Sequence, residues 1–142
     1  MADGVFGPNE NCTQGQIITF IWRAAGQPAP KGTVNMEGFD SSKYYYKAVQ
    51  WAAEQGILEG AFDPDAPCTR ATAMMYLWIN GGRKTSALEN YKDVPKDSPY
   101  RQAIDWAAAV KITGGTGNGN FSPDQVCTRA QIVTFLYRAF NR

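Results

Sequence analysis

The chain has 142 residues, of which 44% are hydrophobic and 19% charged, a composition typical of one globular domain rather than of a disordered segment. Lys plus Arg number 14 and Asp plus Glu 13, so the sequence lacks the basic excess expected of a protein that binds nucleic acid or an anionic membrane. No apolar run approaches the roughly 18 residues needed to cross a bilayer. Histidine, the commonest general base and metal ligand, is absent.

The first residues, Met-Ala-Asp-Gly-Val, lack the basic and apolar regions of a signal peptide. Two interpretations remain at this point. The protein is cytosolic, or the sequence is part of a longer exported chain.

A helix with its own start signal occurs three times, at residues 12–24, 68–80 and 127–139, and the copies align without a gap. In the last copy Thr128 is the predicted N-cap, and Gln131 can reach back to it in a capping box. Four apolar residues then follow at i, i+3, i+4 and i+7, which predicts a buried helix face. They are Ile132, Phe135, Leu136 and Ala139.

The three cysteines, Cys12, Cys68 and Cys127, occupy one equivalent position, directly before the predicted cap. An odd number cannot pair completely within the chain, and no Cys-x-x-Cys spacing signals a zinc or redox site. We interpret each as a small buried apolar residue. The alternative is that three thiols converge on an axis and bind a metal.

A second helix is predicted at residues 45–57 and 100–112, with Trp51 and Trp106 at equivalent positions on amphipathic segments. The first copy lacks this helix, so the sequence holds two and a half repeats. Residues 114–120 are rich in Gly and Asn. We interpret them as a tight connection with positive φ angles, because they carry neither the lysine of a phosphate-binding loop nor the carboxylates of a calcium loop.

We predict one domain over residues 1–142, with the second half of repeat one at 1–30, repeat two at 31–84 and repeat three at 85–142. Gly-containing linkers at 26–32 and 81–86 separate the copies. Helix-loop-helix units of this length cannot bury both faces alone and must pack on one another. The predicted fold is therefore all-α, with the repeats in a pseudo-threefold arrangement around a central three-helix bundle.

The repeated motifs are Phe/Tyr-x-Asp, a Tyr-x-x-Ala-Val/Ile-x-Trp-Ala helix, Gly-Ile-x-x-Gly, Phe-x-Pro, Thr-Arg-Ala and a closing Phe-Leu-x-Arg. In this order they resemble the S-layer homology (SLH) domain, over residues 39–80 and 91–142 and, for half a repeat, 4–25. The resemblance implies an extracellular bacterial module, in the cell wall or S-layer. It also implies grooves between adjacent repeats that bind secondary cell-wall polysaccharide, often pyruvylated and hence anionic.

The candidate binding residues include Arg70 and Arg129, which we place at the second position of their helices. Guanidinium groups beside free backbone N–H groups at a helix start would suit a carboxylate. The alternative is that each arginine ties two repeats together, through Asp40 or Asp93 of a neighbouring turn or through carbonyls of the glycine loop. Gln14 replaces the arginine in the first copy, which predicts a weaker groove or a different ligand there.

Aromatic residues are the other candidates. Trp51 and Trp106 could stack on sugar rings, or they could be core residues that pack on the capped helices. Three equivalent residues of the capped helices are expected to pack at the edge of the bundle: Trp22, Trp78 and Tyr137. A cluster at the start of the second helix could offer hydroxyls to a glycan or simply face solvent: Tyr44, Tyr45, Tyr46 and Tyr100.

The sequence favours a non-catalytic anchoring module with no cofactor and no metal. An alternative is a structural module in which another copy of the chain, or a partner, completes the half repeat. An enzyme is disfavoured, because the sequence has no histidine, no nucleophile motif and no repeated carboxylate pair.

Overall fold

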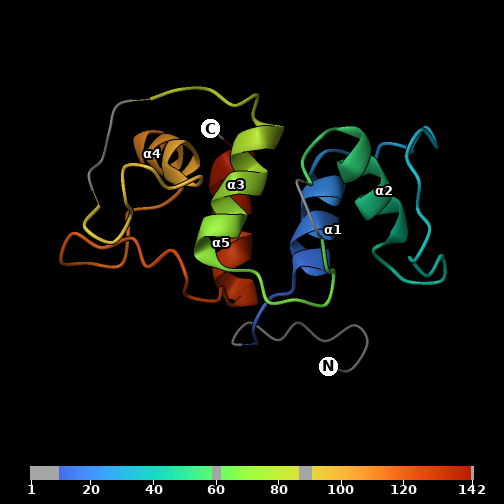
Figure 1. The fold of residues 1–142 in the computed structure, drawn as a ribbon, viewed down its shortest axis with the longest axis horizontal. Helices are drawn as coiled ribbons and strands as arrows, with labels where there is room; N and C mark the ends of the chain where they lie inside the picture. Colours follow the sequence, from blue (N-terminus) through green and yellow to red (C-terminus); the bar gives the residue numbers. More distant parts are fainter. Residues whose placement is uncertain (1–9, 59–61, 87–90, 142) are drawn as a thin grey trace.

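The computed structural model describes residues 10–58, 62–86 and 91–141, which contain five α-helices joined by irregular segments (Figure 1). These are α1 (Gln14–Ala24), α2 (Tyr46–Glu54), α3 (Arg70–Asn80), α4 (Arg101–Ala109) and α5 (Arg129–Phe140). These ranges contain isolated β-bridges but no β-strand. The prediction of an all-α fold is confirmed. None of the helices in these ranges is long and apolar enough to cross a membrane.

Helices α1, α3 and α5 are the repeated capped helices, and each starts where its threonine predicts. Thr128 is the N-cap of α5, and its hydroxyl accepts from the Gln131 N–H at 3.2 Å. The Gln131 side chain accepts from the Thr128 N–H at 2.9 Å, which completes the predicted capping box. Helix α1 has the same capping box. In α3 the equivalent residue is Thr72, whose N–H and hydroxyl both bond to the Thr69 side chain, so the second hydrogen bond of the box is not formed. Capping thus explains all three starts.

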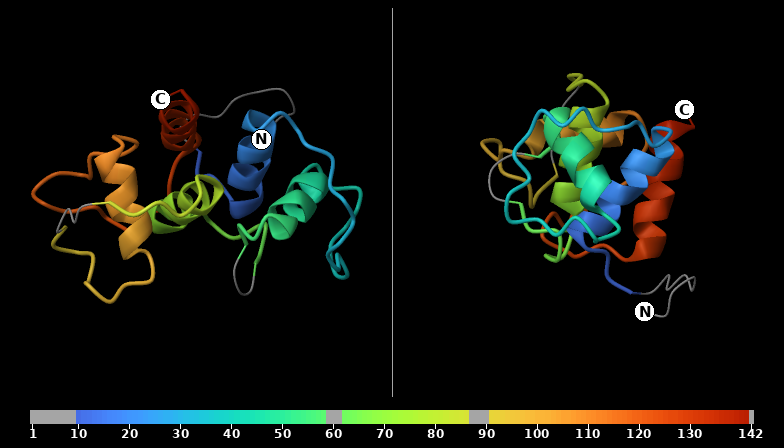
Figure 2. Two further views of the ribbon diagram at one scale, coloured as in Figure 1. Left: turned by 90° about the horizontal axis from the view of Figure 1, so that it is seen from above. Right: turned by 90° about the vertical axis from the view of Figure 1, so that its right-hand side faces the viewer.

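The three capped helices contact one another, and the other two helices lie outside them (Figure 2). Helix α2 packs on α1, and α4 packs on α3. Within the described residues no helix packs on the corresponding side of α5. The pseudo-threefold arrangement of the whole chain stays a prediction.

The cysteine segments join the three capped helices through a closed ring of backbone hydrogen bonds. The Cys12 N–H donates to the Cys127 carbonyl at 2.8 Å, the Cys127 N–H to Cys68 at 2.9 Å, and the Cys68 N–H to Cys12 at 2.8 Å. All three thiols are free and fully buried, which confirms the interpretation as small buried residues. Within the described ranges no group of three or more His, Cys, Asp or Glu is placed to hold a metal.

The first N–H groups of each capped helix donate to carbonyls of the segment just before the cysteine of another repeat. The pairs are Gln14 to Ala66, Gly15 to Pro64, Arg70 to Gln125, Ala71 to Pro123 and Arg129 to Glu10, at 2.8–2.9 Å. Groups that a helix otherwise leaves unpaired at its N-terminus are therefore satisfied between repeats. These bonds hold the repeats in register.

Helix α5 shows what happens where no outer helix is present. Its predicted stripe is buried at Ile132, Phe135 and Leu136, which confirms most of that prediction, but Tyr137 is 68% exposed. The equivalent Trp78 is buried, and its Nε1 donates to the Lys84 carbonyl of the linker after α3 at 2.9 Å. The expectation that Tyr137 packs at the bundle edge is wrong, because in the described structure nothing covers that side of α5.

Candidate functional site

A groove of about 290 Å³ lies at the seam between repeats two and three. Three parts of the chain line it: the start of α3, the glycine loop and the outer turns of α5. The lining residues are Arg70, Thr113, Gly114, Gly115, Ala130, Gln131, Thr134, Phe135 and Arg138. None of them is acidic.

Arg70 forms one wall of this groove and is buried. Its Nε donates to the Phe121 carbonyl at 2.8 Å and its Nη2 to the Thr113 hydroxyl at 3.2 Å. The guanidinium also lies over the rings of Phe121 and Phe135, with its carbon 4.6 Å and 5.6 Å from the two centroids. Burial lowers the pKa of Arg70 from its ordinary value. Within the described residues its Nη1 has no hydrogen-bond partner, so Nη1 is the group that a ligand could reach.

Asp93 holds the same residue, Phe121, from the other side. Its carboxylate accepts from the N–H groups of Phe121 and Ser122, both at 2.8 Å. Burial raises the pKa of Asp93, but these two hydrogen bonds and the positive charge of Arg70 outweigh it, so the net shift is downward. Repeat two therefore holds the Phe121 carbonyl through Arg70. Repeat three, to which Phe121 belongs, holds its N–H through Asp93.

The structure corrects the predicted anion site at two points. Arg70 and Arg129 are the first helical residues, not the second. The N–H groups at the start of α3 are not free, because those of Arg70 and Ala71 donate to carbonyls and that of Thr72 donates to its cap. For Arg70 the structure favours the alternative, because the side chain ties two repeats through the carbonyl of Phe121, the residue that follows the glycine loop.

Arg129 and Gln14, the equivalents of Arg70, have different surroundings. Arg129 is buried, and its Nη1 lies 3.1 Å from the Glu10 carboxylate. Gln14 accepts a hydrogen bond from the Tyr76 hydroxyl at 3.1 Å. It lines a hollow of about 230 Å³ that Thr72 and Tyr100 also line. The three seams therefore carry different chemistry.

The remaining predicted residues do not line the Arg70 groove. Trp51 and Trp106 are 6% and 3% exposed, which favours the core interpretation over sugar stacking. Asp40 lies at an exposed turn, where its Oδ1 accepts from the Ser42 N–H and hydroxyl at 2.9 Å and 2.7 Å. These hydrogen bonds lower the pKa of Asp40. The Asp40 carboxylate is therefore hydrogen-bonded within its own turn.

Of the residues that line the groove, sequence reasoning proposed only Arg70 as a binding residue; Arg138 and Thr113 are among those that it missed. Arg138 donates from Nη1 to the Ile112 carbonyl at 3.2 Å and places a second guanidinium beside that of Arg70. The closing Phe-Leu-x-Arg motif was the signal that could have identified it. Thr113 has no such signal, because only the fold brings it to the Arg70 side chain.

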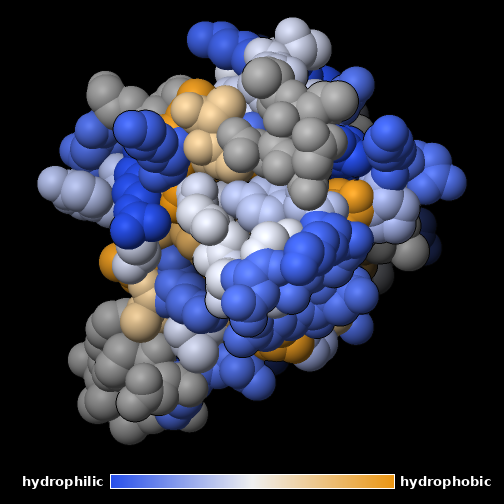
Figure 3. Space-filling view, turned by 90° about the vertical axis from the view of Figure 1, so that its left-hand side faces the viewer, coloured by the Kyte–Doolittle hydropathy of each residue, from blue (hydrophilic) through white to orange (hydrophobic). Residues whose placement is uncertain are grey.

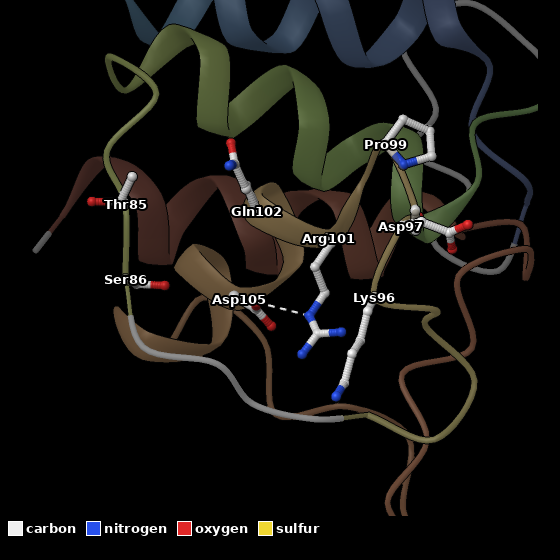
Figure 4. Close-up of a pocket in the computed structure, with 9 residues that line it drawn as sticks. Thr85, Ser86, Lys96, Asp97, Pro99, Arg101, Gln102 and Asp105 are labelled. Atoms are coloured by element: carbon white, nitrogen blue, oxygen red, sulfur yellow. Dashed lines mark hydrogen bonds and ion pairs between the residues drawn. The ribbon is translucent and has the colours of Figure 1, made fainter.

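A second hollow, of about 490 Å³, lies beside α4 (Figure 4). Arg101 and Asp105 line it and form a buried ion pair, with Nε and Oδ2 3.0 Å apart. Lys96 and Asp97 add one charge of each sign. The face on the α4 side is mostly hydrophilic, with small and separate hydrophobic areas (Figure 3).

Comparison with known proteins identifies a matching family model and similar proteins. The family model of the S-layer homology domain matches residues 40–74 and 90–133. A "Cell surface protein" of Thermoanaerobacter kivui is 42% identical over 53 residues, covering 37% of this chain and 7% of the relative. A "Cellulosome-anchoring protein" of Acetivibrio thermocellus is 32% identical over 94 residues, covering 62% and 21%. The chain thus spans a small part of the curated relatives that it matches.

Proposed function

The chain belongs to the S-layer homology domain family, and from this we propose that it is a non-catalytic module that anchors a protein to a bacterial cell surface. The similarity to a protein named for cellulosome anchoring supports this function. We further propose that it holds secondary cell-wall polysaccharide in the grooves between repeats. The observation that carries this proposal is the Arg70 groove, where two guanidinium groups and no carboxylate line one seam.

The chemistry of this groove suits a carboxylate on a sugar, such as a pyruvyl ketal. Arg70 Nη1 and the Arg138 guanidinium are charged donors, and charge-assisted hydrogen bonds to a carboxylate are stronger than neutral ones. Gln131 contributes an amide, because its Oε1 is used in the capping box and its Nε2 remains as donor. Partial burial strengthens these interactions relative to bulk water.

Co-sedimentation with purified cell walls tests the anchoring. We expect retention on intact walls and its loss after acid extraction of the secondary polymer; retention that survives the extraction would contradict the proposal. Arg138→Ala should weaken retention roughly tenfold, because it removes one charged donor from a largely exposed side chain. Lys96→Ala, in the hollow beside α4, is the matched control and should change retention less than twofold.

A second candidate function is a structural module that associates with another copy, and the exposed side of α5 favours it. Val133, Tyr137 and Phe140 are exposed there, although α2 and α4 cover the equivalent sides of α1 and α3. The described residues contain three capped helices but two covering helices, and packing of α5 on α5 of another copy would cover this side. Size-exclusion chromatography with light scattering should then show a dimer that Val133→Ser with Tyr137→Ser abolishes. A monomer at every concentration excludes this candidate.

A further inference from the structure

A hollow that carries positive charge lies outside the Arg70 groove, at the junction of α1 and α2. It has a volume of about 740 Å³. The end of α1, the linker after it and the start of α2 form its walls. The lining residues are Trp22, Gln27, Ala29, Pro30, Ser41, Lys43, Tyr44, Tyr46, Lys47 and Gln50. It shares no residue with the groove at the seam of repeats two and three.

Three aromatic residues give this hollow its shape. Trp22 is half-buried, and its Nε1 donates to the Pro28 carbonyl at 2.8 Å, which fixes the orientation of the indole. Tyr44 is 56% exposed and packs edge-on against the buried Tyr45, with centroids 5.1 Å apart. Tyr46 lines the hollow from the first turn of α2. Supported aromatic rings with accessible faces are suited to contact with the C–H surface of a sugar ring.

The charges of the hollow are of one sign. Lys43 and Lys47 are exposed and form no ion pair within the described residues. No carboxylate lines the hollow; that of the nearby Asp40 accepts hydrogen bonds from Ser42 and also attracts Lys43. Two cations without a lining counter-charge attract an anion.

The hollow of Figure 4 is formed by the equivalent segments of the next repeat, but its charged and aromatic residues differ. Arg101 and Asp105 stand there in place of Tyr46 and Gln50, and they neutralise each other in a buried ion pair. Aromatic rings are absent from its lining. The same place in the fold is therefore neutral in repeat three and cationic and aromatic in repeat two.

We propose that the hollow at the junction of α1 and α2 is a second saccharide site that binds an acidic oligosaccharide of more than one sugar unit. One ring lies against Trp22, near the end of α1, and another against Tyr44, at the start of α2. A carboxylate pairs with Lys43 and Lys47, and the Gln27 and Gln50 amides bond to hydroxyls. The choice of a wall saccharide as natural ligand rests on the proposed function. The recognition of a carboxylated sugar rests on the hollow alone.

The experiment is a titration of the ¹⁵N-labelled chain with trigalacturonate, followed by nuclear magnetic resonance at about 0.15 M salt, where non-specific attraction between exposed charges is largely screened. The fully methyl-esterified trisaccharide is the neutral control. The spectrum contains four tryptophan indole signals, and Trp22→Phe assigns the one of interest. We expect the Trp22 indole and the amides of residues 43–50 to shift with the acid and not with the ester.

Lys43→Gln with Lys47→Gln should weaken this binding roughly tenfold, because each exposed charge pair contributes up to about 1 kcal/mol. Lys96→Gln is the matched control and should leave the affinity within twofold. Any of three results would overturn the proposal: equal signal shifts with the ester, signal shifts confined to the Arg70 groove, or an unchanged affinity of the double variant for trigalacturonate. Wall retention without any trigalacturonate shift would overturn this site and leave the anchoring function standing. A Trp22 shift in a chain that walls do not retain would refute the anchoring and support the site.

Discussion

Arg70→Ala is the substitution that best tests whether the groove arginine holds the fold together. Truncation leaves the Phe121 carbonyl without its donor, and an unsatisfied buried acceptor costs about 1–3 kcal/mol. The lost contacts with two aromatic rings add about 1 kcal/mol. We therefore expect the free energy of unfolding to fall by about 3 kcal/mol. In urea this lowers the midpoint by about 1–2 M, which circular dichroism at 222 nm measures.

Two further variants decide how the result is interpreted. Arg70→Gln introduces the residue that repeat one has at Gln14, and should recover part of the loss because an amide can still donate to Phe121. Arg138→Ala removes the donor of the Ile112 carbonyl, but the side chain is exposed and water can replace it, so the cost should be about 1 kcal/mol, well below that of Arg70→Ala. A loss below 1 kcal/mol for Arg70→Ala, together with lost wall retention, would refute the structural tie and leave Arg70 with a role in the ligand site alone.

Three other predictions follow from the same structure. Gly115→Ala should destabilise the chain by about 1–3 kcal/mol, because Gly115 has φ +80° and a Cβ would lie 2.7 Å from the Asn120 carbonyl oxygen. Gly114→Ala, where a Cβ meets nothing within 4 Å, should be nearly neutral in the same urea assay. Asp93→Asn should cost about 1–2 kcal/mol at pH 7, and the cost should shrink as the pH falls below 3.8, because the lowered pKa of Asp93 adds stability that is lost as the pH falls through the folded-state pKa. Burial raises the pKa of Cys12 to about 12 and that of Cys127 to about 11, so stability should decline as the pH rises above 9, the ordinary value. Denaturation between pH 8 and 11 should show a shallower decline when the three cysteines are replaced by Ala.

The elements of the fold were predictable because their signals are local. A threonine followed three residues later by Gln marks a helix start through two hydrogen bonds that need no tertiary context. The glycine loop was likewise predictable, since Gly115, Gly117, Asn118 and Gly119 all have positive φ. What the sequence could not show is the ring at the cysteines, because three residues far apart along the chain bond there only through their backbones.

The candidate site was less predictable, for a physical reason. Patterns place an arginine on a helix start, but they do not say which carbonyls reach that start from another repeat. The turn that contains Pro123 and Gln125 occupies the N–H groups that were expected to bind an anion, so these groups are not available to a ligand. Trp106 was an equally reasonable candidate for stacking on sugars until packing on α3 placed it in the core.

The three seams differ in a way that determines where an anion can bind. Glu10 already pairs with Arg129, so a ligand carboxylate at that seam would have to compete with an existing charge. Gln14 has no charge to offer and is bonded to Tyr76. Among the described residues, Arg70 is the seam arginine with a donor still available and with no acidic residue beside it in the groove. Because the same guanidinium holds Phe121, a carboxylate bound there would reinforce the contact between repeats two and three, and binding would stabilise the fold by mass action.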